Sequence, residues 1–190
     1  MPSSAGMWIH GSPRLEAILS LSPLGQLVRS RLGPAARPVR AILFDKTPEA
    51  NWALAWHQDR TIAVRQRHQA DGFDRWTVKA GILHVEPPFK LLERMVTARI
   101  HLDPVDEENA PLLVAVGSHR AGRVAEDSIS SIVEGSRIAA CSARPGDVWL
   151  YQTTILHASE RSRKNASRRV LQIDFACDEL PGELDWLGIA

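Results

Sequence analysis

Cysteine is scarce in this chain, whose 190 residues include only Cys141 and Cys177. Two cysteines without metal-site spacing exclude a disulfide-built scaffold and a cysteine-rich zinc site. An excess of charge is also missing, because 23 Lys and Arg residues against 22 Asp and Glu residues give a formal net charge of +1. This balance predicts no general attraction to nucleic acid or to an anionic membrane.

Long apolar runs are absent as well, since no stretch is long enough to span a bilayer. The first residues, MPSSAGMWIHGSP, lack the charged and apolar regions of a secretory signal. We therefore expect a cytoplasmic protein without membrane association. The length of 190 residues and the apolar share of 44% suit one domain over residues 1–190.

The first part of the chain has helical spacing. Serine followed by proline, at 12–13 and again at 22–23, combines an N-cap residue with a first-turn proline. Leucines and isoleucines then recur at intervals of three and four residues. Glycine and proline at 33–34 end the second helix. The sequence therefore predicts a helical N-terminal segment over 1–38.

From residue 39 the pattern changes to short runs, most of them alternating between apolar and polar residues. These runs are 39–46, 60–66, 95–102, 112–119, 147–153 and 169–176. Turn signals such as DPVDEENAP and RPGD separate them, which is typical of a β-sandwich or β-barrel. Residues 67–94 are less regular and contain glycines and a proline pair. We expect a long loop there, which is a candidate lid over a site.

Two polar residues stand close together in the segment AWHQDRTIAV (55–64). His57 and Asp59 are two residues apart, so on a strand they face the same way, with Cα atoms about 6.6 Å apart. Burying them without a partner is unfavourable, but one metal ion can bind both. Taken alone, such a pair is more often a surface or hydrogen-bonded pair than a metal site.

His157, in YQTTILHASERS, is the best candidate for a third ligand, at the end of the strand over 147–153. Two histidines and one carboxylate suit non-haem Fe(II) that activates O₂. Arg168 opens the next run, which we expect to pair antiparallel with the strand that ends at His157. Its guanidinium can bind a dicarboxylate, and Ser159 can add a hydrogen bond. Of Arg168 and Arg169, one is expected to be a solvated strand-end charge.

Five segments together resemble the phytanoyl-CoA dioxygenase family, in the family's order: WHQD (56–59), GSHRAGR (117–123), RPGDVWLY (144–151), LHAS (156–159) and RRVLQIDFA (168–176). The resemblance implies a mainly β fold, a double-stranded β-helix or cupin-like jelly roll, over 39–178. It implies an oxygenase that uses Fe(II), 2-oxoglutarate and O₂, with ascorbate as a candidate accessory reductant. The family's metal ligands fall on His57, Asp59 and His157. Its residues for the 2-oxoglutarate C5 carboxylate fall on Arg168 and Ser159.

Two departures bear on what this resemblance implies. Relatives commonly have an aromatic residue near the co-substrate where this chain has Arg99, and a second cation there can add to dicarboxylate binding. Ala110 stands where relatives often have glycine. Halogenating relatives lack the carboxylate that Asp59 supplies. Hydroxylation of an unactivated C–H bond, with release of succinate and CO₂, is therefore the expected reaction.

The substrate is expected to be a small molecule, because the chain is short for the family. Lys46, Lys79, Arg60 and Arg99 either make the mouth of the site basic, favouring an anionic substrate, or are ordinary solvated charges. Two other hypotheses stay open. One is a non-catalytic jelly-roll binding module, and the other is a zinc-dependent hydrolase, which would need a further acid or base near the metal. No oligomeric state is predicted.

Overall fold

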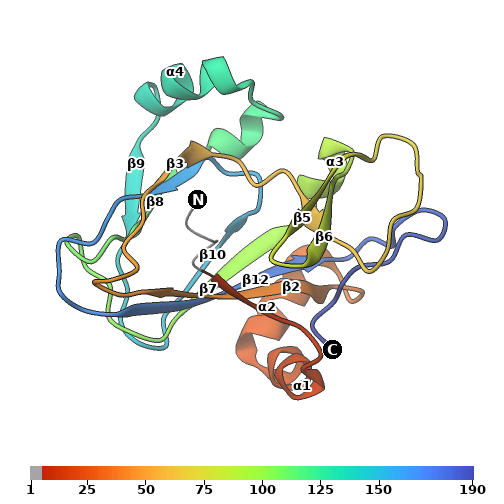
Figure 1. Ribbon diagram of the computed structural model, residues 1–190, viewed down its shortest axis with the longest axis horizontal. Helices are drawn as coiled ribbons and strands as arrows, with labels where there is room; N and C mark the ends of the chain where they lie inside the picture. Colours follow the sequence, from red (N-terminus) through yellow and green to blue (C-terminus); the bar gives the residue numbers. More distant parts are fainter. Residues whose placement is uncertain (1–5) are drawn as a thin grey trace.

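The computed structural model describes residues 6–190, whose strands form three antiparallel sheets (Figure 1). The main sheet has the order β1-β2-β12-β7-β10, with β1 at Gly6–Ile9, β2 at Arg37–Lys46, β7 at Val96–His101, β10 at Val148–Gln152 and β12 at Arg168–Ala176. The minor sheet has the order β3-β11-β8-β9, with β3 at Leu54–His57, β8 at Leu112–Ala115, β9 at Ile138–Cys141 and β11 at His157–Ser159. The two sheets enclose a cavity, and the fold is the predicted jelly roll.

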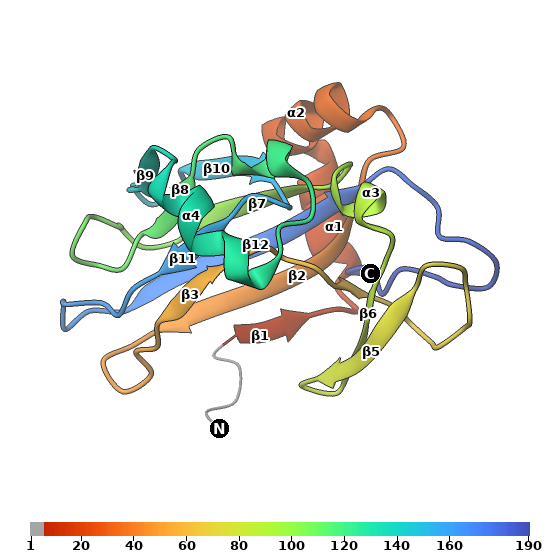
Figure 2. The same cartoon turned by 90° about the horizontal axis from the view of Figure 1, so that it is seen from above.

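The third sheet corrects the prediction of a long loop over 67–94. It has the order β4-β6-β5, with β4 at Ile62–Ala63, β5 at Asp74–Lys79 and β6 at Ile82–Glu86, and α3 at Phe89–Leu92 follows. The β5–β6 hairpin turns at Ala80 and Gly81, which both have positive φ angles, as in type I′ turns. The hairpin lies beside β1, where the rings of Trp8 and His84 are 4.8 Å apart (Figure 2).

Two helices cover the outer face of the main sheet, as the serine–proline pairs predicted. They are α1 at Pro13–Leu21 and α2 at Pro23–Leu32. The Ser22 hydroxyl accepts a hydrogen bond from the backbone N–H of Gly25, and Gly33 ends α2 with a φ angle of 97°. Their apolar sides pack against outward-facing residues of β2, β7 and β12. The segment 1–38 is not wholly helical, however, because β1 precedes α1 and pairs with β2.

The strand predictions are confirmed for four of the six runs and only in part for the other two. The runs 39–46, 95–102, 147–153 and 169–176 match β2, β7, β10 and β12 to within a few residues. The run 60–66 shrinks to β4, and the run 112–119 ends at Ala115. A 3₁₀ turn at Ser118–Ala121, another at Glu126–Ser128 and the helix α4 at Ile129–Glu134 follow β8 above the minor sheet (Figure 1).

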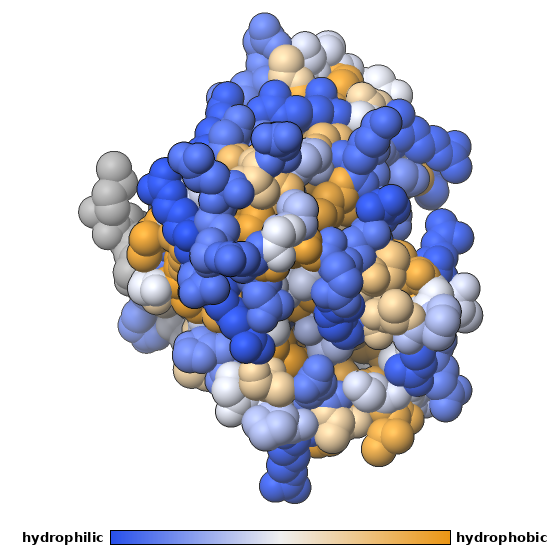
Figure 3. All heavy atoms as spheres, turned by 90° about the vertical axis from the view of Figure 1, so that its right-hand side faces the viewer, coloured by the Kyte–Doolittle hydropathy of each residue, from blue (hydrophilic) through white to orange (hydrophobic). Residues whose placement is uncertain are grey.

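The face that carries β5, β6, α3 and the C-terminal segment is mainly hydrophilic, with small apolar patches between charged side chains (Figure 3). Helices of the described chain are too short or too polar to cross a membrane.

Candidate functional site

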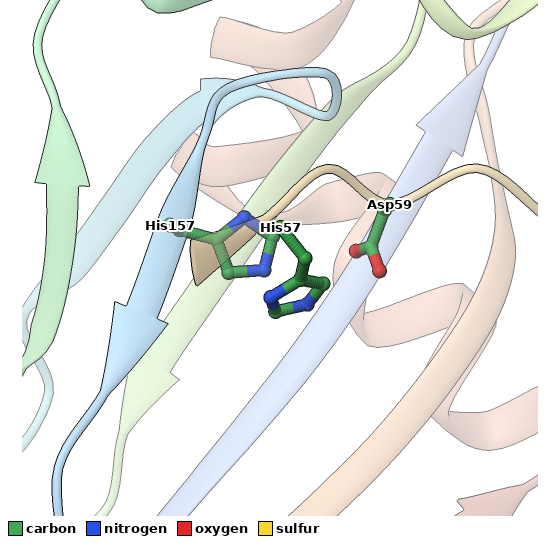
Figure 4. Close-up of side chains that lie close together, drawn as sticks. All are labelled: His57, Asp59 and His157. Carbon is green, nitrogen blue, oxygen red and sulfur yellow. The ribbon is translucent and has the colours of Figure 1, made fainter. Parts of the chain in front are cut away.

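The three predicted metal ligands lie together between the two sheets, and their side chains point toward one another (Figure 4). One ligand atom from each of His57, Asp59 and His157 lies within 4.8 Å of the other two. The two histidines are directly opposite in the antiparallel pair of β3 and β11, with ring centroids 4.3 Å apart. Asp59 follows the end of β3 by two residues. One strand pair thus positions the whole group.

Both histidines are oriented by the same local hydrogen bond. Nδ1 of His57 donates to the carbonyl of Ala55 at 2.8 Å, and Nδ1 of His157 donates to the carbonyl of Ile155 at 2.9 Å. A carbonyl partner fixes the proton on Nδ1, so Nε2 carries the free lone pair of a metal ligand. Burial lowers the pKa of His157 to about 4, so this imidazole is neutral at pH 7.

Gln58 lies between the two ligands, just after β3, and anchors this segment to neighbouring loops. Its side chain is buried and donates to the carbonyls of Gly122 and Thr154 at 2.9 and 2.8 Å. It also accepts the backbone N–H of Val124 at 2.9 Å. Residues alternate along the chain here, so Gln58 points away from the site while His57 and Asp59 face it.

Asp59 is ionised in the free protein. Burial raises the pKa of its carboxyl, but Arg40 and then the two histidines outweigh this, so that the pKa lies below its usual range. Nη2 of Arg40 lies 3.4 Å from Oδ2 of Asp59. A carboxylate and two imidazoles form a donor set that suits Fe(II) and leaves other coordination positions open.

The cavity beside these ligands has a volume of about 200 Å³. Alternate residues of β2 face it, in the order Arg40, Ile42 and Phe44, and the next in this row is Lys46. Trp8 and Lys79 line the cavity together with Asp59, and Trp52, Leu112 and Ser159 line it together with Arg168. We call the part at Asp59 the metal end and the part at Arg168 the anion end.

Three buried cations surround the anion end. Lys46, Arg99 and Arg168 are 1%, 6% and 2% exposed. Lys46 and Arg168 are directly opposite in the pair of β2 and β12. Over residues 6–190, none of the three cations forms an ion pair with a carboxylate, and Nε of Arg99 and of Arg168 has no hydrogen-bond partner.

The hydrogen bonds of these cations go to neutral groups. Nζ of Lys46 donates to Oγ of Ser159 at 3.1 Å and to the carbonyl of Glu160 at 2.5 Å. Arg168 donates to the carbonyl of Ala110, an alanine with a φ angle of 50°. Burial, and then the neighbouring guanidinium groups, lower the pKa of Lys46 to about 7. Burial and Arg99 lower the pKa of Arg168 to about 9.

Unpaired buried cations are costly in a folded protein. Three of them in one pocket raise that cost through mutual repulsion. A bound carboxylate would accept hydrogen bonds from their free donors and reduce the repulsion. The hydroxyl and guanidinium donors of the anion end therefore suit the oxygens of a carboxylate group.

Arg99 lies across the sheet from the other cations. Its Nη1 donates to Oε1 of Gln172 at 2.7 Å, and its guanidinium carbon lies 5.4 Å from the centre of the Phe44 ring. Both neighbours also line the cavity. The structure thus places Arg99 in the pocket wall, where the sequence led us to expect a second cation.

Other sequence predictions need correction. β11, which carries His157, does not continue the strand over 147–153 and does not pair with β12. β11 lies in the minor sheet and β12 in the main sheet, so Ser159 and Arg168 reach the same cavity from opposite walls. Arg169 is the solvated neighbour, because it pairs with Asp103 at 2.8 Å.

The predicted basic mouth is only partly right. Arg99 is buried in the cavity wall, and Lys46 is buried beside the lining residue Ser159, so neither lies at the mouth. Lys79 lines the cavity at the metal end. Arg60 turns away from the cavity and contacts the Val124 carbonyl.

Sequence reasoning named Lys46 only as a candidate for the mouth of the site, and it missed Trp8 and Arg40 entirely. The only local signal is the alternation along β2, which puts Arg40 and Lys46 on one face. Trp8 reaches the cavity because β1 pairs with β2, opposite Ile42. Such pairings join residues far apart in the sequence.

Comparison with known proteins gives a family match over most of the chain. The family model described as phytanoyl-CoA dioxygenase (PhyH) matches residues 20–170. No curated protein matches the chain in sequence.

Solved structures show the same fold at low sequence identity. EctD from S. alaskensis with bound Fe has a TM-score of 0.69 at 20% identity, over 98% of this chain and 61% of that one. EctD with 2-oxoglutarate and 5-hydroxyectoine has a TM-score of 0.66 at 21% identity, over 90% and 56%. The non-heme alpha ketoglutarate dependent carbocyclase SnoK has a TM-score of 0.52 at 18% identity, over 81% and 58%. The chain thus matches little more than half the length of each of these structures.

Proposed function

Because the chain belongs to the phytanoyl-CoA dioxygenase family, we propose that it is an oxygenase dependent on Fe(II) and 2-oxoglutarate. The observation that carries the proposal is the pairing of two sites in one cavity. Two histidines and a carboxylate converge at the metal end. Three buried cations surround the anion end, and none of them has an acidic partner in the part of the chain that the structure describes. Solved structures with the same fold include one with bound Fe and one with 2-oxoglutarate.

The residues at the metal end fit Fe(II). His57 and His157 offer Nε2 because Nδ1 of each is held by a carbonyl, and Asp59 offers a carboxylate oxygen. A bound iron and its keto-acid co-substrate supply the activation of O₂, with release of succinate and CO₂. We include ascorbate in the proposal only as an accessory reductant.

The residues at the anion end fit the far carboxylate of 2-oxoglutarate. Arg168 and Lys46 supply charge, and Ser159 supplies a hydroxyl that already contacts Lys46. Arg99 adds a third cation over the Phe44 ring. A distal carboxylate held by these residues would orient the co-substrate in the cavity and exclude water from it.

The reaction that we propose is hydroxylation of a small molecule, because Asp59 keeps the carboxylate ligand in place. An anionic substrate is supported by Lys79, which lines the metal end and donates to Oγ1 of Thr61 at 3.2 Å. Trp8 and Ile42 give the same region an apolar wall.

The substrate proposal can be tested with pairs of small molecules that differ only in carrying a carboxylate or an amide. We expect the carboxylate of a pair to stimulate succinate formation more, and Lys79→Met to remove that preference. A preference for the amide in the unchanged protein would contradict the proposal.

The cavity disfavours the two alternatives. A hydrolase would need a further acid or base, but Asp59 is the only carboxylate among the described residues that line the cavity. A module with a vestigial site would lack a ligand, whereas all three are present and oriented.

The direct test of the oxygenase proposal is succinate formation from 2-oxoglutarate under air. We expect succinate with Fe(II) and none with Zn(II), and we expect His57→Ala to remove it. Release of a hydrolysis product with Zn(II), without succinate in either case, would contradict the proposal.

A further inference from the structure

A row of polar residues crosses the main sheet at the metal end. Arg40 on β2 is directly opposite Asp174 on β12, and Asp174 is directly opposite Thr97 on β7. All three side chains are buried, with exposures of 8%, 1% and 0%. Burying polar groups inside a sheet costs free energy, and hydrogen bonds or ion pairs must offset that cost.

These residues form a continuous chain of contacts that ends on the metal ligand. Thr97 donates to Oδ1 of Asp174 at 2.8 Å, and Thr97 and Thr153 share a hydrogen bond of 3.0 Å. Nε of Arg40 pairs with Oδ2 of Asp174. Nη2 of Arg40 reaches Oδ2 of Asp59 at 3.4 Å.

The guanidinium of Arg40 is held on every side. Its third nitrogen, Nη1, lies 3.4 Å from the carbonyl of Thr61, two residues after Asp59. Each nitrogen therefore has a different partner, and two of the partners belong to the segment that carries the ligand. Burial lowers the pKa of Arg40, but the effect of Asp174 and Asp59 is larger and raises the pKa above its usual value. The guanidinium therefore stays charged.

The contact with Arg40 distinguishes the two oxygens of Asp59. Oδ2 accepts a hydrogen bond from Nη2 of Arg40, whereas Oδ1 accepts no hydrogen bond from any residue of the described chain. Groups that hydrogen-bond to a metal ligand fix its orientation and tune the metal site.

We propose that Arg40, fixed by Asp174 and Thr97, is a positioning residue that holds Oδ2 of Asp59 and leaves Oδ1 for the metal. The proposal rests on the proposed metal site and concerns a residue outside the ligand set. Lysine would not serve equally, since an ammonium is a point charge and cannot span three partners as a planar fork does.

The sign of the effect separates positioning from simple electrostatics. Removing the positive charge of Arg40 reduces the repulsion of a divalent cation, so electrostatics alone would strengthen metal binding. Loss of positioning would weaken it. A weakened site in Arg40→Met therefore supports positioning.

The experiment is a titration with Co(II) alone, followed by its visible d–d absorption, which reports both affinity and coordination geometry. We expect Arg40→Met to raise the dissociation constant about tenfold or more, with an altered spectrum, and Arg40→Lys to give a smaller loss. Arg60→Met is the matched control, because it removes the same charge one residue from Asp59 while its guanidinium contacts Val124 and Glu126 instead. We expect a change within about twofold for this control.

A second arm tests whether Arg40 acts through Asp59. In an Asp59→Asn background, Arg40→Met should have no further effect on Co(II) affinity, because coupled residues are not additive. A wild-type dissociation constant and spectrum in Arg40→Met would overturn the proposal, as would an equal loss in Arg60→Met. Failure of the unchanged protein to bind Co(II) would instead overturn the metal site itself.

If Arg40→Met does not fold, Thr97→Val provides the second variant. It removes the hydroxyl that Asp174 accepts and leaves both charges in place. We expect a loss of about threefold in Co(II) affinity, since one link of an outer-shell network is removed. An unchanged affinity in this variant would overturn the proposal.

Discussion

The two ends of the cavity differ in how the protein balances their charges. At the metal end, Asp59 is matched by Arg40, and Arg40 is matched in turn by Asp174. At the anion end, Lys46 and Arg168 face each other, and neither has an acidic partner among residues 6–190. The metal end thus has its charges paired within the protein, whereas the cations of the anion end are left for the carboxylate ligand that we propose. We therefore expect a bound ligand to lower the free energy of the folded protein more at the anion end than at the metal end.

The largest effect is expected from removing a ligand at the metal end. His57→Ala should weaken Fe(II) binding by more than about 100-fold, since even outer-shell changes cost 10- to 100-fold. Equilibrium dialysis under anaerobic conditions measures this. His68→Ala is the control, because His68 pairs with Glu183 outside the cavity. Equal affinity in His57→Ala and the control would show that the metal binds elsewhere.

A charge removed from the anion end should spare the metal and weaken the co-substrate. Arg168→Met is expected to raise the dissociation constant for 2-oxoglutarate about 10- to 100-fold, since a hydrogen bond to a charged group contributes about 1.5–3 kcal/mol. Calorimetry on protein loaded with Ni(II) measures it.

Arg169→Met is the matched control, because Arg169 is the next residue and pairs with Asp103 at the surface. A loss in Arg169→Met without one in Arg168→Met would place the wrong arginine in the pocket.

Binding at the anion end should also depend on pH. The pKa of Lys46 is lowered to about 7, so this group is protonated below pH 7 and increasingly neutral above it. A carboxylate favours the protonated form, so binding above pH 7 must take up a proton and weaken as pH rises. The dissociation constant for 2-oxoglutarate should rise by up to about tenfold per pH unit above 7.

Calorimetry between pH 6 and 8.5 checks this dependence, and Lys46→Met should flatten it. A profile in Lys46→Met as steep as that of the unchanged protein would assign the proton to another group.

The smallest effect concerns the backbone beside Arg168. Ala110 has a φ angle of 50°, which is unfavourable for a residue with a Cβ atom, and its carbonyl accepts from Arg168. Ala110→Gly should stabilise the fold by about 1 kcal/mol by relieving this strain. Urea unfolding measures the change. Destabilisation would show that the flexibility of glycine in the unfolded chain outweighs the strain.

The fold could be predicted from the patterns of its long strands and from the spacing of His57 and Asp59. β2 and β12 are nine or ten residues long, so their patterns are clear. β3, β9 and β11 have three or four residues, which is too few to show a period. The β5–β6 hairpin was missed because its turn is Ala80-Gly81, and alanine is rare at positive φ.

The residues of the site also fall into two groups, those that the sequence could predict and those that it could not. His57 and Asp59 are two residues apart, so a strand pattern predicted their common direction, although β3 ends at His57 and Asp59 follows it. Lys46, Arg40 and Trp8 could not be assigned, because their place depends on which strands pair and in what register. A lysine at a strand end looks like a solvated charge until its partner across the sheet, Arg168, is known.

The most direct test of the account is an anaerobic titration of Fe(II)-loaded protein with 2-oxoglutarate, followed by the visible charge-transfer band of the chelate. We expect the band in the unchanged protein and in Arg169→Met, no band in His57→Ala, and the same band at higher 2-oxoglutarate concentration in Arg168→Met. Fe(II) binding without a band in the unchanged protein would contradict the assignment of the anion end. A band that forms at the same concentration in Arg168→Met would contradict its role there.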